Sequence, residues 1–180
     1  LLLVVDNGSI YTKQLTDFLS EKNISFEKYT PYILELNSLQ KYDSIILSGR
    51  RKNDKKINEV NSKIINFSIK NKKKLLGICY GAEILALTLG GTIRKTQSIQ
   101  KGNEIIEILK DDLITKNSIN VFESHAFEIS KLPNILIIIG KSNNCKYEII
   151  KHKENLIFGT QFHPEMTPDG NNLIENFCSL

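Results

Sequence analysis

The stretch LLGICYGAEILALTLGG, residues 75–91, limits the possible folds of this 180-residue chain more than any other segment. An apolar run leads directly into GICYG (77–81), and a helical pattern follows that ends at a Gly-Gly pair. A strand that turns at once into a helix leaves no room for side chains two positions before and after the turn, so glycine is needed at both. The pattern predicts a nucleophile elbow with Cys79 at its tip, where the dipole of the following helix favours the thiolate.

Segments typical of strands and of helices alternate on both sides of this turn. Apolar or alternating runs predict strands at 1–7, 25–30, 43–49 and 73–78, and one-sided apolar patterns predict helices at 10–22, 57–70 and 82–91. The second half holds closely spaced strand-like runs at 103–109, 120–124, 134–142, 146–152 and 156–162, before a helical pattern at 170–180. Alternating strands and helices form right-handed crossovers and a parallel sheet. We therefore predict one α/β domain over residues 1–180 with a mainly parallel central sheet, and hairpins or a mixed sheet in its second half.

Charge and cysteine content narrow the functional classes. The net charge of +4 comes largely from basic runs at 50–56 and 70–74, which lack the interleaved aromatic residues of nucleic-acid-binding patches. We expect these runs to form a solvated face or a docking face for an acidic partner, and we expect no nucleic-acid partner. No apolar stretch reaches the roughly 18 residues of a membrane-spanning helix, so no membrane contact is predicted. Three cysteines without a zinc motif or a disulfide framework fit a cytoplasmic protein.

A thiol nucleophile needs a base, and the chain has three histidines. His152 lies in the polar stretch KHKEN, where we expect a surface residue. His163 follows the strand-like run LIFGTQF and precedes Pro164 and Glu165. This spacing lets the carboxylate hold one ring nitrogen while the other faces the sulfur, as in a catalytic triad. We predict His163 as the base and Glu165 as the residue that orients it.

An acyl intermediate also needs hydrogen-bond donors for its oxyanion. The amide of Tyr80, directly after the nucleophile, is the expected first donor. The second donor is expected from the loop at 48–50, which follows the strand-like run DSIIL.

At these motifs the chain resembles the class I, triad-type glutamine amidotransferases. The resemblance spans nearly the whole chain and rests on DSIILSG (43–49), LLGICYGAEILALTLGGTI (75–93), the Ser-His pair in VFESHAFEI (121–129) and FGTQFHPEM (158–166). It implies a three-layer, flavodoxin-like architecture. Within the family, ESHAFEI followed by Leu-Pro, together with GKSNNCKYEIIKH (140–152), resembles the separate glutaminase subunit of archaeal-type GMP synthases.

The resemblance implies a glutaminase reaction. Cys79 would attack the side-chain amide of glutamine, His163 would protonate the leaving ammonia, and Glu165 would fix the imidazole. Ammonia would pass to a synthetase partner, expected to be the ATP-pyrophosphatase subunit of GMP synthase, which would itself hold ATP, magnesium and xanthosine monophosphate. We expect no metal and no cofactor on this chain. The expected substrate-binding residues are Gly49, Arg50, Tyr80, Glu83, Ser124, His125, Ala126 and Phe127, with the amides of Arg50 and Tyr80 as the oxyanion hole and the His125 side chain in a supporting role.

Two positions depart from the family pattern. Gly49-Arg50-Arg51 stands where the family has Gly-Gly-Pro, and arginine reaches glycine-like backbone angles only at a cost of about 1 kcal/mol or more. Glu83 stands where the family has glutamine, and a carboxylate cannot donate the hydrogen bonds of an amide, although it could pair with an α-ammonium group. We therefore expect an oxyanion loop that is misaligned in the free chain or forms only with a partner, and weak activity in the free chain. Two alternatives stay open: a γ-glutamyl hydrolase-type enzyme, and a non-catalytic regulatory subunit.

Overall fold

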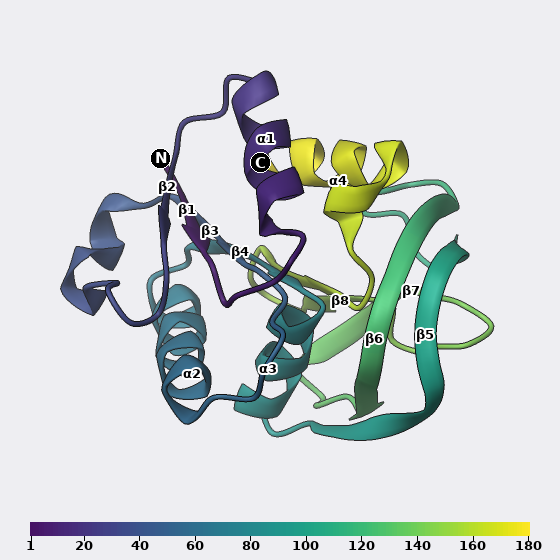
Figure 1. Ribbon diagram of the computed structural model, residues 1–180. Helices are drawn as coiled ribbons and strands as arrows, with labels where there is room; N and C mark the ends of the chain where they lie inside the picture. Colours follow the sequence, from purple (N-terminus) through teal and green to yellow (C-terminus); the bar gives the residue numbers. More distant parts are fainter.

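A computed structural model describes residues 1–180 and shows a single α/β domain with three layers (Figure 1). The strands are β1 (Leu2–Val5), β2 (Phe26–Tyr29), β3 (Ser44–Leu47), β4 (Lys74–Ile78), β5 (Thr92–Ile108), β6 (Ile119–Lys131), β7 (Leu136–Lys141), β8 (Ile149–His152) and β9 (Ile157–Thr160). The helices are α1 (Thr12–Glu21), α2 (Lys55–Lys70), α3 (Tyr80–Thr88) and α4 (Pro168–Ser179), with short 3₁₀ turns η1 (Leu36–Lys41) and η2 (Pro164–Met166). None of the helices is both long and apolar enough to cross a membrane.

The nine strands form one mixed sheet in the order β2-β1-β3-β4-β9-β8-β7-β5-β6. The five strands from β2 to β9 pair in parallel, and the remaining pairings are antiparallel. The alternation of strands and helices in the first half thus gives the expected parallel sheet, and the closely spaced strands of the second half give the expected antiparallel part. The carboxyl ends of β1, β3, β4 and β9 meet at one edge, which is where open α/β sheets place their ligands.

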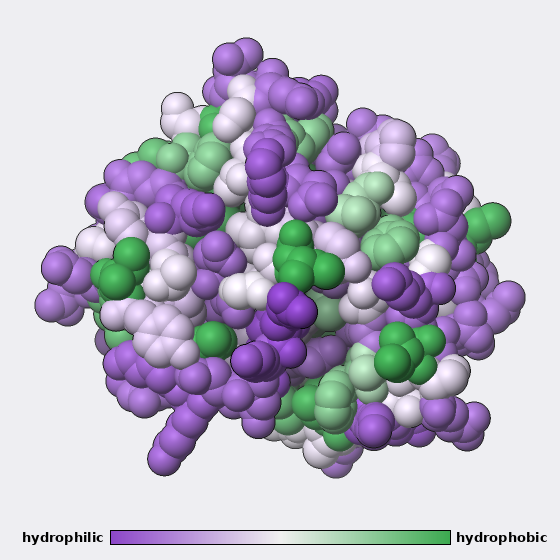
Figure 2. All heavy atoms as spheres, in the orientation of Figure 1, coloured by the Kyte–Doolittle hydropathy of each residue, from purple (hydrophilic) through white to green (hydrophobic).

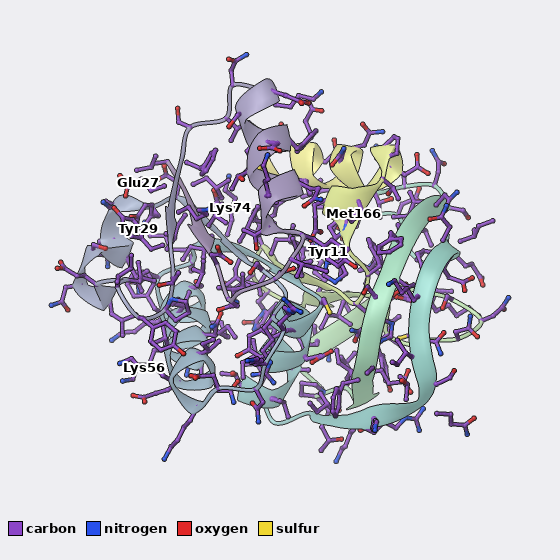
Figure 3. The ribbon with its side chains drawn as sticks, viewed as in Figure 1. Tyr11, Glu27, Tyr29, Lys56, Lys74 and Met166 are labelled. Carbon is purple, nitrogen blue, oxygen red and sulfur yellow. The ribbon has the colours of Figure 1, made fainter.

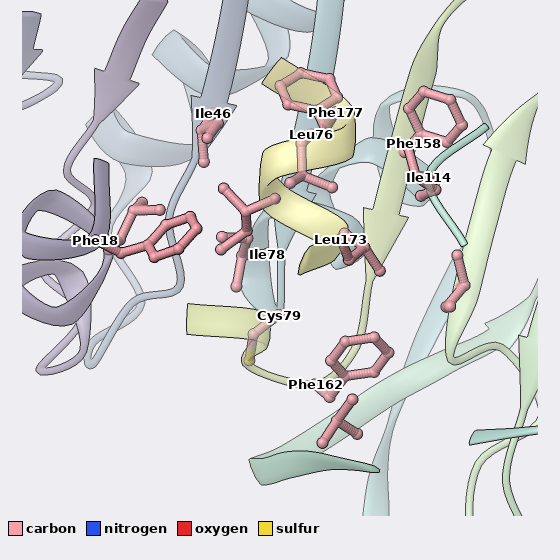
Figure 4. Packing of buried hydrophobic residues seen from close by; sticks show 14 of the residues in the cluster. Phe18, Ile46, Leu76, Ile78, Cys79, Ile114, Phe158, Phe162, Leu173 and Phe177 are labelled. Atoms are coloured by element: carbon pink, nitrogen blue, oxygen red, sulfur yellow. The ribbon is translucent and has the colours of Figure 1, made fainter. Parts of the chain in front are cut away.

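Two hydrophobic clusters lie on opposite faces of this sheet. Successive strand residues point to opposite faces, so Leu2 and Val4 join one cluster while Leu3 and Val5 join the other. Helices α1 and α4 cover the first cluster, and α2 and α3 cover the second. Figure 4 shows Cys79 at the end of the first cluster, between Ile78 and Phe162. The elbow residue therefore packs directly against the first hydrophobic cluster.

The β5–β6 ribbon extends well beyond the segments that the sequence predicts as strands. β5 begins at Thr92, and its side chains are mostly exposed or half-buried on both faces. It pairs with β6 along most of its length and touches the rest of the sheet only through Glu107 and Ile108. β5 has almost no buried residues, so its sequence carries no clear apolar alternation, whereas β6 buries alternate residues along its first half. The segment of the turn η1 carries no apolar periodicity typical of a helix or strand.

Candidate active site

The elbow at Cys79 is a strained turn that only its two glycines allow. Cys79 has φ 52° and ψ −105°, backbone angles that a residue with a side chain rarely adopts. A methyl group on Gly77 would lie 2.4 Å from the carbonyl carbon of Gly81, and one on Gly81 would lie 2.5 Å from the carbonyl oxygen of Leu47 in β3. The amide of Cys79 donates to the carbonyl of Thr160 at 2.7 Å, which ties the turn to β9. The structure thus contains the strand–turn–helix geometry that the sequence predicts.

The Cys79 thiol sits in surroundings that oppose its ionisation. Burial raises its pKa well above the ordinary value, and the nearby carboxylates of Glu83 and Glu165 raise it further. These effects outweigh the Tyr80 amide, which favours the thiolate. The helix terminus thus acts in the predicted direction, but desolvation and neighbouring negative charge are stronger and the thiol pKa is raised.

His163 and Glu165 form a buried pair at the end of β9. The Nδ1 atom of His163 lies 2.8 Å from Oε1 of Glu165, and both side chains are almost fully buried. The His163 amide donates to the carbonyl of Phe122 at 2.8 Å, so β6 also holds this turn. A methyl group on Gly49 would lie 3.0 Å from Cε1 of His163 and 3.6 Å from Cβ of Cys79, so the thiol and the imidazole flank the same glycine. The sulfur makes no hydrogen bond to the ring in this structure, and such bonds are often loose before a substrate binds.

His152 does not line this site, and its ring stabilises a turn of the backbone. Its Nδ1 atom accepts hydrogen bonds from the amides of Glu154 and Asn155 at 3.1 Å, and the side chain belongs to the turn after β8. The residue is buried, so the expected surface position is wrong. Burial lowers its pKa, which agrees with a neutral ring that accepts hydrogen bonds.

Tyr11 contacts this site although its sequence context did not single it out. Its ring packs edge-on against His163 with 4.6 Å between ring centroids, and its hydroxyl donates to Oγ of Ser124 at 3.1 Å. It thereby joins the start of α1 to β6, as Figure 3 shows. Its loop position after β1 was the only available signal, because loops at the carboxyl edge of a parallel sheet converge on one site.

A cavity of about 350 Å³ opens beside the sulfur. Its lining includes every predicted substrate-binding residue except Gly49, which lies beneath it against Cys79 and His163. The lining residues are Arg50, Arg51, Lys52, Asn53, Cys79, Tyr80, Glu83, Ile93, Ser124, His125, Ala126 and Phe127. A larger hollow of about 660 Å³ lies between β5, β6 and β7, but no cysteine or histidine lines it. The smaller cavity is therefore the candidate active site.

The loop after β3 is held by a network around Arg50. The guanidinium of Arg50 lies 3.9 Å from the centroid of the Tyr80 ring and donates to Oδ1 of Asn58 in α2. The Tyr80 hydroxyl donates to the same oxygen at 2.8 Å. Arg50 does not have a positive φ, so the backbone strain expected for arginine at this position is absent. Asn58, which the sequence did not indicate, thus fixes both side chains next to the sulfur.

Two buried ionisable groups lie on the far wall of the cavity. Glu83 accepts a hydrogen bond from Nε2 of Gln161 at 3.2 Å, and burial raises the pKa of this carboxyl. The ring of His125 lies between the carbonyl of Phe127, 2.8 Å from Nδ1, and the carboxylate of Glu123, 3.0 Å from Nε2. Glu123 is a further group that the sequence pattern did not reveal, since an acid in a strand-like run has no distinguishing spacing.

Comparison with known proteins identifies the family. The family model for glutamine amidotransferase class-I matches residues 3–179. The chain belongs to the class I glutamine amidotransferases. This amidotransferase is 30% identical, over its whole length and 97% of the relative, to one of the subunits of glutamine-hydrolyzing GMP synthase of Methanocaldococcus jannaschii. It is 31% identical to the glutamine-hydrolyzing GMP synthase of Thermosipho melanesiensis, where the match spans 99% of this chain but only 35% of that protein. The family predicted from the sequence is confirmed, and the chain is an enzyme of this family.

Solved structures agree with the fold of this amidotransferase. A Thermoplasma acidophilum protein described as a GMP synthase subunit superposes with a TM-score of 0.88 at 27% identity, covering 99% of this chain and 92% of that one. A Thermotoga maritima glutamine amidotransferase superposes with a TM-score of 0.79 at 21% identity, covering 97% and 80% of the two chains. The predicted three-layer α/β architecture is therefore confirmed.

Proposed function

We propose that this chain is the glutaminase subunit of a two-subunit GMP synthase, and that Cys79, His163 and Glu165 hydrolyse glutamine. The observation that carries the proposal is the meeting of the elbow cysteine and the His163–Glu165 pair at Gly49, beside one cavity. The relatives that are single GMP synthase subunits, which this chain matches over nearly their full length, support the assignment to that enzyme.

The first step follows from the protonation states in the free chain. The Cys79 thiol is neutral because burial raises its pKa, so the thiolate must form by proton transfer to His163. Glu165 stabilises the resulting imidazolium through Nδ1, at 2.8 Å. The thiolate then attacks the side-chain amide carbon of glutamine, and a C–S bond forms. The negative charge moves to the amide oxygen, where the backbone amides of Tyr80 and Arg50 are the proposed donors.

Collapse of this intermediate releases ammonia. His163 returns its proton to the leaving nitrogen, the C–N bond breaks, and a γ-glutamyl thioester remains on Cys79. Water then attacks the thioester while His163 takes its proton, the C–S bond breaks, glutamate is released, and the proton passes from His163 to the sulfur to restore the Cys79 thiol. The β6 residues Ser124, His125, Ala126 and Phe127 line the cavity, and their main chain is proposed to hold the amino-acid end of glutamine.

A synthetase partner is needed to use the ammonia. We propose the ATP-pyrophosphatase subunit of GMP synthase, working in the cytoplasm, because the Thermosipho melanesiensis relative is about three times as long as the part that this chain matches. In Figure 2, hydrophilic side chains dominate the outer part of this face, and hydrophobic and intermediate ones gather near its centre. The basic run 50–56 borders the cavity, whereas 70–74 lies at the other end of α2 (Figure 3), so the two runs do not form one docking face.

A glutamine-mimicking electrophile, such as a diazoketone analogue, tests the chemistry. With the partner present it should label Cys79, and Cys79→Ala should abolish glutamine-dependent synthesis while synthesis from free ammonia continues. Absence of labelling would favour the regulatory alternative. Release of glutamate from poly-γ-glutamyl substrates without ammonia would favour the γ-glutamyl hydrolase alternative. Loss of both synthetic activities in Cys79→Ala would contradict the proposed division of labour.

A further inference from the structure

A cluster of buried ionisable groups lies behind the cavity, and the proposed reaction leaves it without a role. Glu123 and His125 are two residues apart on β6, so their side chains share one face of the strand. Glu148, in the turn before β8, and Glu83, on α3, complete the cluster. All four residues are buried, with exposed fractions from 1% to 6%.

The contacts of His125 determine its charge state. Its Nδ1 atom lies 2.8 Å from the Phe127 carbonyl oxygen, which can only accept a hydrogen bond. Its Nε2 atom lies 3.0 Å from a carboxylate oxygen of Glu123, although the angle is not that of an aligned hydrogen bond. A neutral imidazole has one N–H and would turn a lone pair toward one of these oxygens. With Glu123 ionised, both nitrogens face acceptors, so both would carry protons and the ring would be an imidazolium.

Glu148 is the second buried carboxyl that faces Glu123. Burial and the facing carboxylate of Glu123 raise the pKa of Glu148 to about 9, so Glu148 keeps its proton at neutral pH. One of its oxygens accepts from the Ser142 hydroxyl at 2.7 Å. The Glu123 oxygens have no protein donor in hydrogen-bond geometry, so the Glu148 proton and the His125 ring are the groups that face them.

We propose that Glu123 is a positioning residue that holds His125 as an imidazolium, and that this buried cation binds the α-carboxylate of glutamine by charge. The inference rests on the proposed glutaminase function. It makes Glu123, which does not line the cavity, a determinant of substrate selection. Glu83, which lies near His125 in the same cluster, then carries the charge that suits the α-ammonium group. The cavity would thus match the zwitterionic end of an amino acid.

The other cations near the cavity are poorly placed for this role. The guanidinium of Arg50 is engaged by Tyr80 and Asn58. Arg51 and Lys52 are exposed, so solvent and salt weaken their attraction for a carboxylate. Burial alone would lower the pKa of His125, but Glu123, the Phe127 carbonyl and Glu83 reverse that effect and raise it above the ordinary value. A buried charge also acts through a lower effective dielectric than an exposed one.

The test compares glutamine with 4-aminobutanamide, which is glutamine without its α-carboxyl group, using the chain with its synthetase partner. Glu123→Gln should raise KM for glutamine about ten-fold, change kcat about two-fold at most, and leave kcat/KM for 4-aminobutanamide unchanged. In the same variant, NMR of the His125 ring should show its titration midpoint falling by about one pH unit or more. Glu107→Gln, at an exposed acid on β5, and Glu148→Gln, which keeps the Glu123 carboxylate, are controls that should preserve a protonated His125.

Three results would overturn the inference: an unchanged KM for glutamine in Glu123→Gln, an equal loss for both amides, or a His125 ring that is neutral at pH 7 in the wild-type chain. The last measurement needs no variant, so it holds even if Glu123→Gln fails to fold. Larger selective losses in Arg51→Ala or Lys52→Ala would assign the carboxylate to the rim instead. If the wild-type complex hydrolyses neither amide and Cys79 is not labelled, the proposed glutaminase function fails, while the NMR titration still decides the charge of His125.

Discussion

Gly77→Ala is the substitution whose effect the structure defines most closely. The new methyl group would lie 2.4 Å from both the carbonyl carbon and the carbonyl oxygen of Gly81, and 2.8 Å from the amide nitrogen of Ala82. All three are backbone atoms at the start of α3, so no flexible side chain can make room. Restoring an ordinary contact requires the elbow to move by roughly 1 Å, and overpacking of this kind costs about 1–3 kcal/mol of unfolding free energy.

The catalytic loss in Gly77→Ala should exceed the loss of stability. A displacement of roughly 1 Å at a reacting atom lowers rates about 100-fold, because the sulfur no longer meets the substrate carbon in line. For a chain of this size, Tm should fall by roughly 4–8 °C for about 2 kcal/mol. The assays are glutaminase rates with the synthetase partner, labelling of Cys79 by the glutamine analogue, and thermal unfolding.

Gly90→Ala supplies the matched control. Gly90 has φ +92° with nothing within 4 Å of an added methyl group, so alanine there costs about 1 kcal/mol of backbone strain without touching the elbow. It should lower Tm and leave the glutaminase rate nearly unchanged. The reasoning is refuted if Gly77→Ala retains the wild-type rate, or if Gly90→Ala loses activity to the same degree.

Three further predictions concern charge. Glu165→Gln should lower kcat about 10²–10⁴-fold with little change in Tm, because the imidazolium loses its anion, and a wild-type rate would remove Glu165 from the mechanism. The folded-state pKa of Glu148 is about 9 against an ordinary value of 4.5, so the folded chain binds the extra proton between these values and stability is lost as pH rises through that window. In Glu148→Gln, the unfolding free energy measured in urea should therefore fall less steeply as pH rises, by at most about 1.4 kcal/mol per pH unit. An unchanged slope against pH would contradict this. Lys52→Glu with Lys56→Glu should weaken partner binding about ten-fold in a salt-dependent way, whereas a double reversal within 70–74 should not, and equal effects would place docking elsewhere.

The parallel half of the sheet and the elbow could be predicted from sequence because both are encoded by residues close together in the chain. Strands β1 to β4 follow one another in the chain with a helix or a short 3₁₀ turn between them, so local apolar periodicity is sufficient for their pairing, whereas β9 joins β4 from much later in the sequence. The glycines at 77 and 81 act on the same turn. His163 and Glu165 are two residues apart, so their contact needs little more than one turn of backbone.

The β5–β6 ribbon and the contacts of Tyr11 and Asn58 could not be predicted in the same way. The ribbon is stabilised by pairing between two strands, of which β5 has no continuously buried face. Tyr11 meets Ser124 across 113 positions of sequence, and Asn58 meets Tyr80 across 22. Such contacts depend on which strand ends the sheet brings together, and residue type alone does not indicate them.

The sequence by itself determined the family, the α/β architecture and the candidate nucleophile, base and orienting acid, because glycine spacing and the His-Pro-Glu triplet constrain the backbone locally. Only the tertiary structure decided the charges around them. Burial and the carboxylates of Glu83 and Glu165 keep the Cys79 thiol neutral, against the local effect of the helix terminus. Packing of β6 against the turn before β8 gives Glu148 the proton and leaves His125 between two acceptors. Ionisation depends on the solvent and charge within a few ångströms in space, and folding sets that environment from residues far apart in the chain.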